Sequence, residues 1–275
     1  MAAGVWKNPF KLYRPIGAAR GKGVPNIQRI RRLVGGLGVA LMVALPPGGL
    51  AHADPLPQGE AKAFKKALDA IDDNNLRRAR SSAAGVKNPL ALRIITWVRL
   101  NRPDPKATFE EISRFMDENP DWPGQKGLQR RAEEAMNGKT PDDAVLAWFK
   151  DRRPVSGDGK ARLGEALLAA GKPEEGEKAI RDAWINGNFT KRRERAFYKR
   201  HRRLLTVENH RRRLDRLQWD GRYWPARRML WKVGPGYRAL GVARLFLRHR
   251  RGNVDKAIAK VSDELKNDPG LIYER

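Results

Sequence analysis

The 275-residue chain contains no cysteine. This absence excludes disulfide bonds and metal sites built from thiolates, so packing, polar contacts or partners must stabilise the fold. Acidic residues are also scarce, because 31 Asp and Glu stand against 57 Lys and Arg, which gives a formal net charge of +26. An apolar content of 40% still suffices for a hydrophobic core, and we therefore expect a folded protein.

The chain lacks a hydrophobic run long enough to cross a membrane. The best candidate, residues 33–45, is shorter than the roughly 20 apolar residues that a spanning helix needs, and two prolines follow it. Arginines precede this run and Ala51-His52-Ala53 follows it, which is the order of features in a secretory signal. We predict that residues 1–53 are a basic leader plus a signal peptide, cleaved after Ala53, and that the mature chain is exported. The long leader leaves open a later start codon or a twin-arginine signal.

Strand-like alternation is absent as well, and apolar residues recur instead at the spacing of helices. In the first part of the mature chain this spacing predicts helices containing residues 61–71, 90–98, 109–118, 128–136, 142–149, 163–170 and 173–184. In the second part it predicts helices at residues 193–205, 207–219, 224–233, 237–250 and 254–265.

Two helix starts carry recognisable caps. Thr108-Phe109-Glu110-Glu111 has the form of a capping box, in which the Thr108 hydroxyl accepts from the Glu111 N–H and the Glu111 carboxylate reaches back. Thr140 and Pro141 predict a second start, with a cap and a proline in the first turn. Short helices joined by such turns, with alanine at close-packing positions, predict an all-α protein. More specifically, we expect residues 54–275 to form an α-solenoid or superhelix of degenerate tetratricopeptide-like hairpins.

The positive charge is concentrated in one stretch. Residues 191–251 contain 21 Lys or Arg and only four acidic residues. Because aromatic residues are interleaved with these cations, the stretch is a candidate surface for binding polyanions. The candidate residues are Arg192, Arg193, Arg195, Lys199, Arg200, Arg202, Arg203, Arg211, Arg212, Arg213 and Arg216.

The alternative is that these arginines form a solvated face that pairs with acidic residues of neighbouring hairpins or of a missing domain. If the face binds a ligand, export favours anionic polymers or lipids of the cell envelope over nucleic acid. The tryptophans do not decide between these alternatives. We expect Trp122, Trp148, Trp184, Trp219, Trp224 and Trp231 to pack between helices rather than to stack on sugars.

No catalytic residue, metal site or cofactor site is predicted. Glu133 and Glu134 are adjacent and follow two arginines, so we expect salt-bridged surface groups rather than the positioned carboxyl group that glycoside cleavage needs. The histidines lack ligand spacing for zinc, and the sequence has neither a nucleophile elbow nor a phosphate-binding glycine loop.

Several motifs carry a resemblance to a known family. They include the run at residues 115–125, which reads Phe-Met-Asp-Glu-Asn-Pro-Asp-Trp-Pro-Gly-Gln, together with the segments at 147–149, 159–171, 181–184, 208–221 and 226–230, and the ending at 269–275. These segments resemble the N-terminal, U-shaped superhelical domain of soluble lytic murein transglycosylases, over most of the mature chain.

The resemblance implies a periplasmic scaffold of helical hairpins. In that family a following lysozyme-like domain cleaves the β-1,4 bond between N-acetylmuramic acid and N-acetylglucosamine of peptidoglycan, using a glutamate in a Glu-Ser motif with a Gly-Leu-Met-Gln run downstream. Neither motif occurs in this chain. The sequence therefore looks like the scaffold alone, truncated at its C-terminal end, with no catalytic residue to carry over.

Three hypotheses follow. The chain is a non-catalytic scaffold that positions peptidoglycan or a separate catalytic domain or protein. Alternatively, it is a basic helical-repeat protein that binds anionic polymers or, less expectedly, nucleic acid. The third hypothesis is a nonfunctional truncated fragment.

Overall fold

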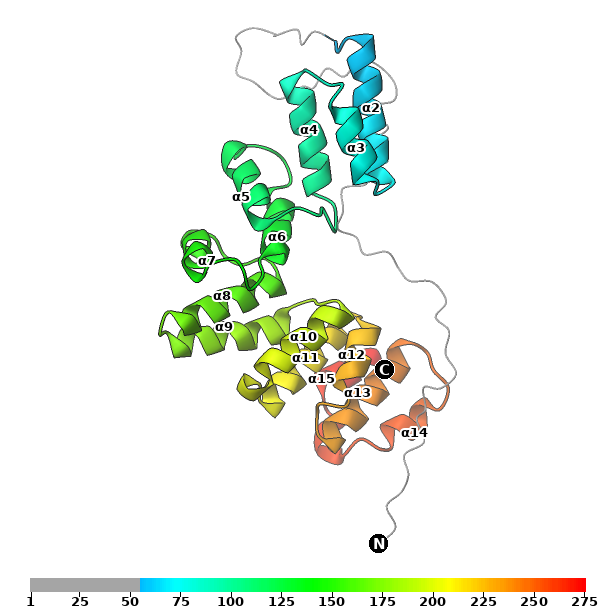
Figure 1. Ribbon diagram of the computed structural model, residues 1–275. Helices are drawn as coiled ribbons and strands as arrows, with labels where there is room; N and C mark the ends of the chain where they lie inside the picture. Colours follow the sequence, from blue (N-terminus) through cyan, green and yellow to red (C-terminus); the bar gives the residue numbers. More distant parts are fainter. Residues whose placement is uncertain (1–54) are drawn as a thin grey trace, which may run out of the picture. The chain divides into compact units, whose positions relative to one another are not determined.

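A computed structural model describes residues 55–275 (Figure 1). The predicted leader, signal peptide and cleavage site after Ala53 lie outside the described residues. Residues 63–275 form one compact unit, and the packing described below is that of this unit.

Regular structure in residues 55–275 is helical throughout, with no strand, which confirms the all-α prediction for that part of the chain. The first seven α-helices of the described residues are α2 (Gln58–Asp72), α3 (Leu76–Ala83), α4 (Pro89–Leu100), α5 (Phe109–Glu118), α6 (Gln125–Ala135), α7 (Asp142–Phe149) and α8 (Gly157–Ala169). The next seven are α9 (Pro173–Asn186), α10 (Lys191–His201), α11 (Val207–Trp219), α12 (Tyr223–Met229), α13 (Pro235–Arg248), α14 (Val254–Ile258) and α15 (Pro269–Glu274). None of these helices is both long and apolar enough to cross a membrane.

Most helices lie where the sequence analysis expects them, but α10 and α12 end before the predicted ends at residues 205 and 233, and α15 was not predicted. The single helix predicted at 254–265 is wrong, because α14 ends early and Ser262, with ψ at 152°, is extended before a 3-10 turn at Asp263–Leu265. Helix α3 was not predicted, since its sequence is too polar to show an apolar stripe. Its start is nevertheless capped, because the Asn75 side chain accepts from the Arg78 N–H at 3.0 Å.

Helices in this unit contact mainly their neighbours along the chain. Helix α5 packs on α6, α7 on α8, α8 on α9, α11 on α12 and α13 on α14. Contacts between α6 and α8, α9 and α11, and α11 and α13 then join one helix pair to the next.

Glycines bring α8 and α9 together most closely. A Cβ atom on Gly164 would lie 2.7 Å from the Ile180 side chain and 2.9 Å from the Gly176 carbonyl oxygen. A Cβ atom on Gly176 would lie 2.7 Å from Leu168 and 2.9 Å from the Gly164 carbonyl oxygen. The two helices can therefore cross at this distance only because neither glycine has a side chain.

An apolar core holds α5, α6 and α7 together. Phe109, Ile112 and Phe115 of α5 are buried in it, and the Phe109 ring meets the Trp148 ring edge-on, with centroids 5.2 Å apart. The predicted caps of these helices are only partly correct. The Thr108 hydroxyl accepts from the Glu111 N–H at 3.2 Å, but the Glu111 carboxylate pairs with Arg99 rather than closing the box.

The second predicted cap is misplaced. Helix α7 begins at Asp142 with Pro141 as its N-cap, so the proline precedes the first turn. Thr140 does not cap α7, because its hydroxyl instead accepts from the Asn137 N–H at 3.3 Å.

Glu133 is a buried carboxylate, which corrects the expectation of a surface salt bridge. Its side chain is fully buried and accepts from the Ser156 N–H at 2.7 Å and from the Val155 N–H at 2.9 Å, just before α8. Burial raises the pKa of Glu133, although hydrogen bonds from Ser156, Val155 and Gln129 oppose that shift. Only Glu134 forms the expected ion pair, at 2.5 Å from Arg131. Glu133 therefore fixes the start of α8 and does not resemble an accessible catalytic acid.

Candidate anion-binding surface

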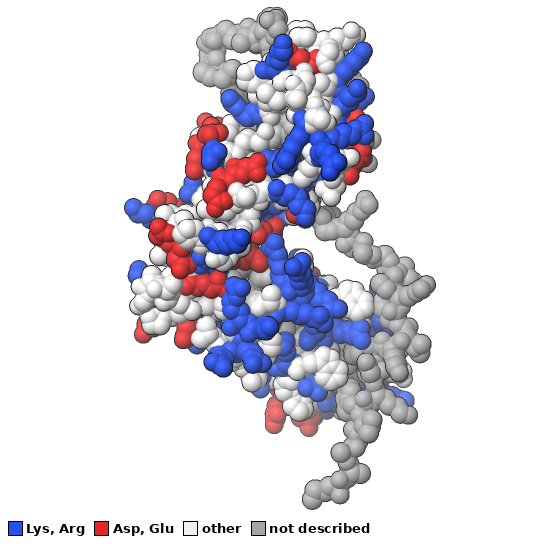
Figure 2. Space-filling view, viewed as in Figure 1, with Lys and Arg blue, Asp and Glu red and all other residues white. Residues whose placement is uncertain are grey.

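Helix α10 has a buried side, which we call the inner side of the basic stretch, and an exposed side, which we call its outer side. The helix starts at Lys191 and is capped by Thr190, whose hydroxyl accepts from the Arg193 N–H at 3.3 Å. Glu194, Phe197 and His201 follow at helical spacing and are buried. Figure 2 shows that Lys and Arg gather over the α10 to α12 segment, whereas Asp and Glu are more frequent over α5 to α9.

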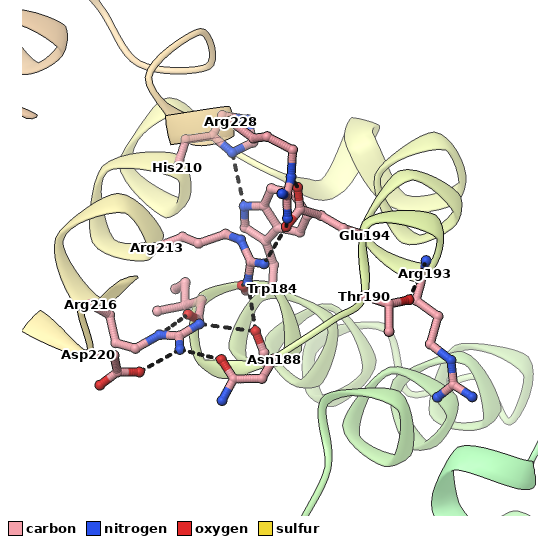
Figure 3. Close-up of polar contacts among 12 residues, drawn as sticks. Trp184, Asn188, Thr190, Arg193, Glu194, His210, Arg213, Arg216, Asp220 and Arg228 are labelled. Atoms are coloured by element: carbon pink, nitrogen blue, oxygen red, sulfur yellow. Dashed lines mark hydrogen bonds and ion pairs between the residues drawn. The ribbon is translucent and has the colours of Figure 1, made fainter. Parts of the chain in front are cut away.

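Arg213 of α11 lies at the centre of the inner side (Figure 3). Its side chain is 1% exposed, and it pairs with the Glu194 carboxylate at 3.1 Å. It also donates to the carbonyl oxygens of Trp184 and Gly187, and its guanidinium carbon lies 4.4 Å from the centre of the Trp184 ring. Arg213 was predicted as a ligand-binding residue, but its burial excludes it from the surface.

Glu194 is the only acidic residue of α10, and its carboxylate pairs with two arginines. Arg228 of α12 donates to its Oε1 atom at 2.8 Å and to its Oε2 atom, which also accepts from Arg213, at 3.1 Å. Burial raises the pKa of the Glu194 carboxyl, but the hydrogen bonds and charges of Arg228 and Arg213 outweigh burial and hold that pKa below its ordinary value. Sequence analysis missed Arg228, because its partner Glu194 is 34 residues away in the sequence.

His210 completes the buried group and is held neutral. Its Nδ1 atom accepts from the Trp184 indole N–H at 3.0 Å. Burial, together with the positive charges of Lys232 and Arg213, lowers the pKa of His210 from 6.5 to about 4. The hydrogen bond requires the unprotonated Nδ1, so the geometry and the lowered pKa agree.

Four other candidate residues have partners within the fold. Arg216 donates to the carbonyl oxygens of Ile185 and Gly187 and pairs with Asp220 at 2.8 Å. Arg193 and Arg200, on one flank of α10, pair with two acidic residues of α8, Asp158 at 2.6 Å and Glu165 at 2.8 Å. Arg211 lies 3.7 Å from Glu208 and stacks on the Tyr237 ring at 4.1 Å.

The other six candidates are exposed and form no ion pair within 4.0 Å in the part of the chain that the structure describes. These residues are Arg192, Arg195, Lys199, Arg202, Arg203 and Arg212, and we call them the free basic face. Arg192 and Lys199 lie seven residues apart on the side of α10 opposite to its buried residues, and Arg203 lies in the 3-10 turn at Arg202–Leu204 that follows the helix. Within the described residues, five of the eleven candidates therefore have partners in the fold, whereas six do not form an ion pair.

The tryptophan prediction is correct for only part of the chain. Trp148 and Trp184 are buried, and Trp122 packs against the core. Trp219, Trp224 and Trp231 are instead exposed by 42%, 42% and 58%. Trp224 and Trp231 are each covered by an arginine, Arg227 at 5.4 Å and Arg238 at 4.9 Å from the ring centre. Exposed aromatic rings thus accompany the cations of α12 and the start of α13.

Fold and surface together define an all-α protein of consecutive helix pairs that displays an unpaired cationic face. The described residues contain no group of three or more His, Asp or Glu arranged to hold a metal ion. The chain matches no family model, no curated protein and no solved structure.

Proposed function

We propose that the chain is a non-catalytic helical scaffold that binds an anionic polymer through its free basic face. The observation that carries this proposal is the division of the eleven candidate cations. Five are used by the fold, while six remain exposed on α10, the following turn and α11 and form no ion pair within 4.0 Å in the described residues. Unpaired cations along one surface raise the local concentration of a polyanion and release its counterions on binding.

Peptidoglycan of the periplasm is the polymer that we propose first. The support is the resemblance to the superhelical domain of lytic murein transglycosylases, which also implies a solenoid arrangement and a catalytic domain or protein as partner. Packing of helix pairs on their neighbours is compatible with a solenoid. The segment that carries the resemblance forms a compact turn between α5 and α6, where the Gln125 amide donates to the carbonyl oxygens of Asn119 and Pro120.

A binding experiment with matched charge variants tests the proposal. The test variant neutralises two exposed cations of α10 and one of the turn that follows it, as Arg192→Gln, Lys199→Gln and Arg203→Gln. The control neutralises three exposed cations of α3, as Arg77→Gln, Arg78→Gln and Arg80→Gln, so both proteins carry the same net charge. Co-sedimentation with purified peptidoglycan and titration with heparin are measured at several salt concentrations.

We expect the test variant to bind at least tenfold more weakly at low salt and to show a shallower salt dependence, whereas the control stays close to wild type. Equal losses in both variants would mean that net charge alone drives binding, which would contradict a defined face. Release of 1,6-anhydro muropeptides by the wild-type chain alone would contradict the non-catalytic assignment.

Nucleic acid is the second candidate ligand, because exposed aromatic rings beside cations also suit single strands. Single-stranded DNA in the same titration separates the two, since a preference for it over peptidoglycan would favour this alternative.

A further inference from the structure

Large hydrophobic side chains gather on the surface where α11 ends beside α15. Trp219 is the last residue of α11, and the centre of its exposed ring lies 5.0 Å from the centre of the Tyr273 ring of α15. Tyr273 and its neighbour Ile272 are exposed by 69% and 56%. Helix α13 packs on both α11 and α15, so it holds these side chains in one region (Figure 1).

A second group of rings lies at the start of α12. Trp224 is exposed and meets the Tyr223 ring edge-on, with ring centres 5.0 Å apart. Tyr223 in turn meets the ring of His249, which directly follows α13, at 4.7 Å between centres. These ring contacts place Trp224 at the C-terminal end of α13.

Arg248, the last residue of α13, joins the two groups. It pairs with Glu274 of α15 at 2.7 Å. A Cβ atom on Gly221, in the turn between Trp219 and Trp224, would lie 3.0 Å from the Nη2 atom of Arg248. The two groups therefore belong to one surface. We call it the aromatic patch, and it consists of Trp219, Trp224, Ile272 and Tyr273.

The aromatic patch contains four of the eight large hydrophobic side chains that are exposed in the described residues. A concentration of exposed apolar groups of this kind marks an interaction surface.

Cations border the aromatic patch. Arg222 precedes α12 and Arg250 follows α13, and both are exposed. Arg250 forms no ion pair within 4.0 Å in the part of the chain that the structure describes. Two carboxylates also lie at this border, but Asp220 pairs with Arg216 at 2.8 Å and the Glu274 side chain is only 6% exposed. The unpaired charge among these residues is thus positive, which favours a partner with negative charge.

The chemistry of these side chains fits the surface of a lipid bilayer. Trp and Tyr combine an apolar body with a polar N–H or O–H group, and both residue types concentrate at the level of lipid head groups. Ile272 gains from contact with an apolar phase such as acyl chains, which a hydrated polysaccharide does not supply. Arginines attract anionic head groups, and the strength of such binding follows the buried apolar area plus this attraction.

We propose that the aromatic patch docks on the surface of an anionic lipid bilayer, with Trp219 and Trp224 at the level of the head groups. The bordering arginines then lie against the lipid phosphates. The aromatic patch contains no residue of the free basic face, so this proposal goes beyond the binding of polymers and does not depend on it.

Co-sedimentation of the full chain with vesicles tests this surface. One set of vesicles contains phosphatidylcholine alone, and the other set also contains phosphatidylglycerol. The test variant combines Trp219→Ser with Trp224→Ser, and the control combines Leu90→Ser with Leu92→Ser, which changes two exposed apolar residues of α4. The two variants and wild type have the same net charge, and thermal melts compare their folding.

We expect wild type to bind the anionic vesicles at least tenfold more tightly than the neutral ones. The test variant should lose at least tenfold of this affinity, whereas the control should stay close to wild type. If the test variant melts early, Ile272→Ser with Tyr273→Ser on α15 replaces it and should show the same loss. Equal affinities of the test variant and the control, or no binding of wild type to anionic vesicles, would overturn the proposal.

Fluorescence separates the aromatic patch from the free basic face. At saturating vesicle concentration, brominated lipids should quench the tryptophan fluorescence of wild type and, equally, of the variant with Arg192→Gln, Lys199→Gln and Arg203→Gln. The test variant should show less quenching and keep the heparin and peptidoglycan affinities of wild type. Failure of the vesicle experiments would therefore leave the polymer proposal intact.

Two outcomes would assign the aromatic patch to another partner. Vesicle binding without any quenching of wild type would overturn insertion of the tryptophans. Self-association of wild type in analytical ultracentrifugation, abolished by Trp219→Ser with Trp224→Ser, would overturn the proposal in favour of a contact with a second copy of the chain.

Discussion

The segment of α5 to α9 and the segment that follows it use charge in opposite ways. Residues 109–186 contain 16 acidic and 13 basic residues, whereas residues 191–251 contain four acidic and 21 basic residues. The first segment is held by an apolar core and by close helix crossings. In the second, Arg213 and Arg244 are buried within the helix packing and bind carboxylates.

This difference separates two roles for arginine. A few arginines of the second segment replace apolar core residues and satisfy carbonyl oxygens at helix ends. The four acidic residues of this segment, together with Asp158 and Glu165 of α8, pair with only part of the remainder, so unpaired cations remain on the outer surface. The comparison predicts that stability and ligand binding depend on different arginines.

The largest effect should come from Glu194→Gln. This substitution leaves Arg213 buried beside a neutral side chain, and breaking a buried pair in this way costs about 3–5 kcal/mol in the free energy of unfolding. The matched control is Glu208→Gln, which removes the exposed partner of Arg211 and should cost less than about 0.5 kcal/mol. Chemical denaturation measures both. If the two variants lose the same stability, the second segment is not held together by its buried ion pair.

Acidification should weaken the second segment through His210. The pKa of His210 is about 4 in the folded chain and 6.5 in the absence of burial, so the unfolded chain binds the extra proton between these values. The stability contributed by neutral His210 is present above pH 6.5 and is lost as the pH falls toward 4, by up to about 3 kcal/mol.

The variant His210→Gln isolates this contribution, because the glutamine oxygen can still accept from the Trp184 indole. We expect the difference between wild type and His210→Gln in the free energy of unfolding to vary with pH across that window. A constant difference from pH 7 to pH 4 would show that His210 titrates normally.

In the first segment, the close crossing of α8 and α9 should be sensitive to a single methyl group. Gly176→Ala places a Cβ atom 2.9 Å from a backbone oxygen, and such overpacking costs about 1–3 kcal/mol. Gly138→Ala is the control, because nothing lies within 4 Å of its Cβ position. In thermal denaturation, we expect a lower melting temperature for Gly176→Ala and an unchanged one for Gly138→Ala. A similar drop in both variants would argue against the tight crossing.

The smallest effect on stability is expected for the free basic face. Arg192→Gln, Lys199→Gln and Arg203→Gln break no ion pair, so the triple variant should stay within about 0.5 kcal/mol of wild type or become slightly more stable as repulsion falls. Denaturation in urea at low salt checks this result. A loss above 1.5 kcal/mol would mean that these cations have partners in the fold.

The sequence predicts the helices well and the roles of the arginines poorly. Helix α11 has the predicted bounds, because Thr206 caps its start and Gly221, with φ at 66°, follows its end. Within it, the adjacent residues Arg212 and Arg213 are exposed and buried, respectively. Arg213 lies on the same helical stripe as the buried Leu214 and Leu217, and this position indicates burial. A count of charges alone does not reveal it.

Partners distant in sequence could not be predicted. Glu194 and Arg228 are 34 residues apart on two helices, and no local pattern joins them. Exposure of Trp219, Trp224 and Trp231 likewise depends on which helices cover each ring, whereas the apolar spacing only indicates that an aromatic side chain faces some neighbour.

The most direct test of the division between structural and free cations is a set of eleven single Gln variants, one for each candidate residue. Each variant is measured for its free energy of unfolding and for its heparin affinity under conditions in which it is folded. We predict that Arg213→Gln and Arg216→Gln lose stability and keep the affinity of wild type. Arg192→Gln, Lys199→Gln and Arg203→Gln should lose affinity and keep stability. Variants that lose both in proportion, with no separation into two groups, would contradict the account.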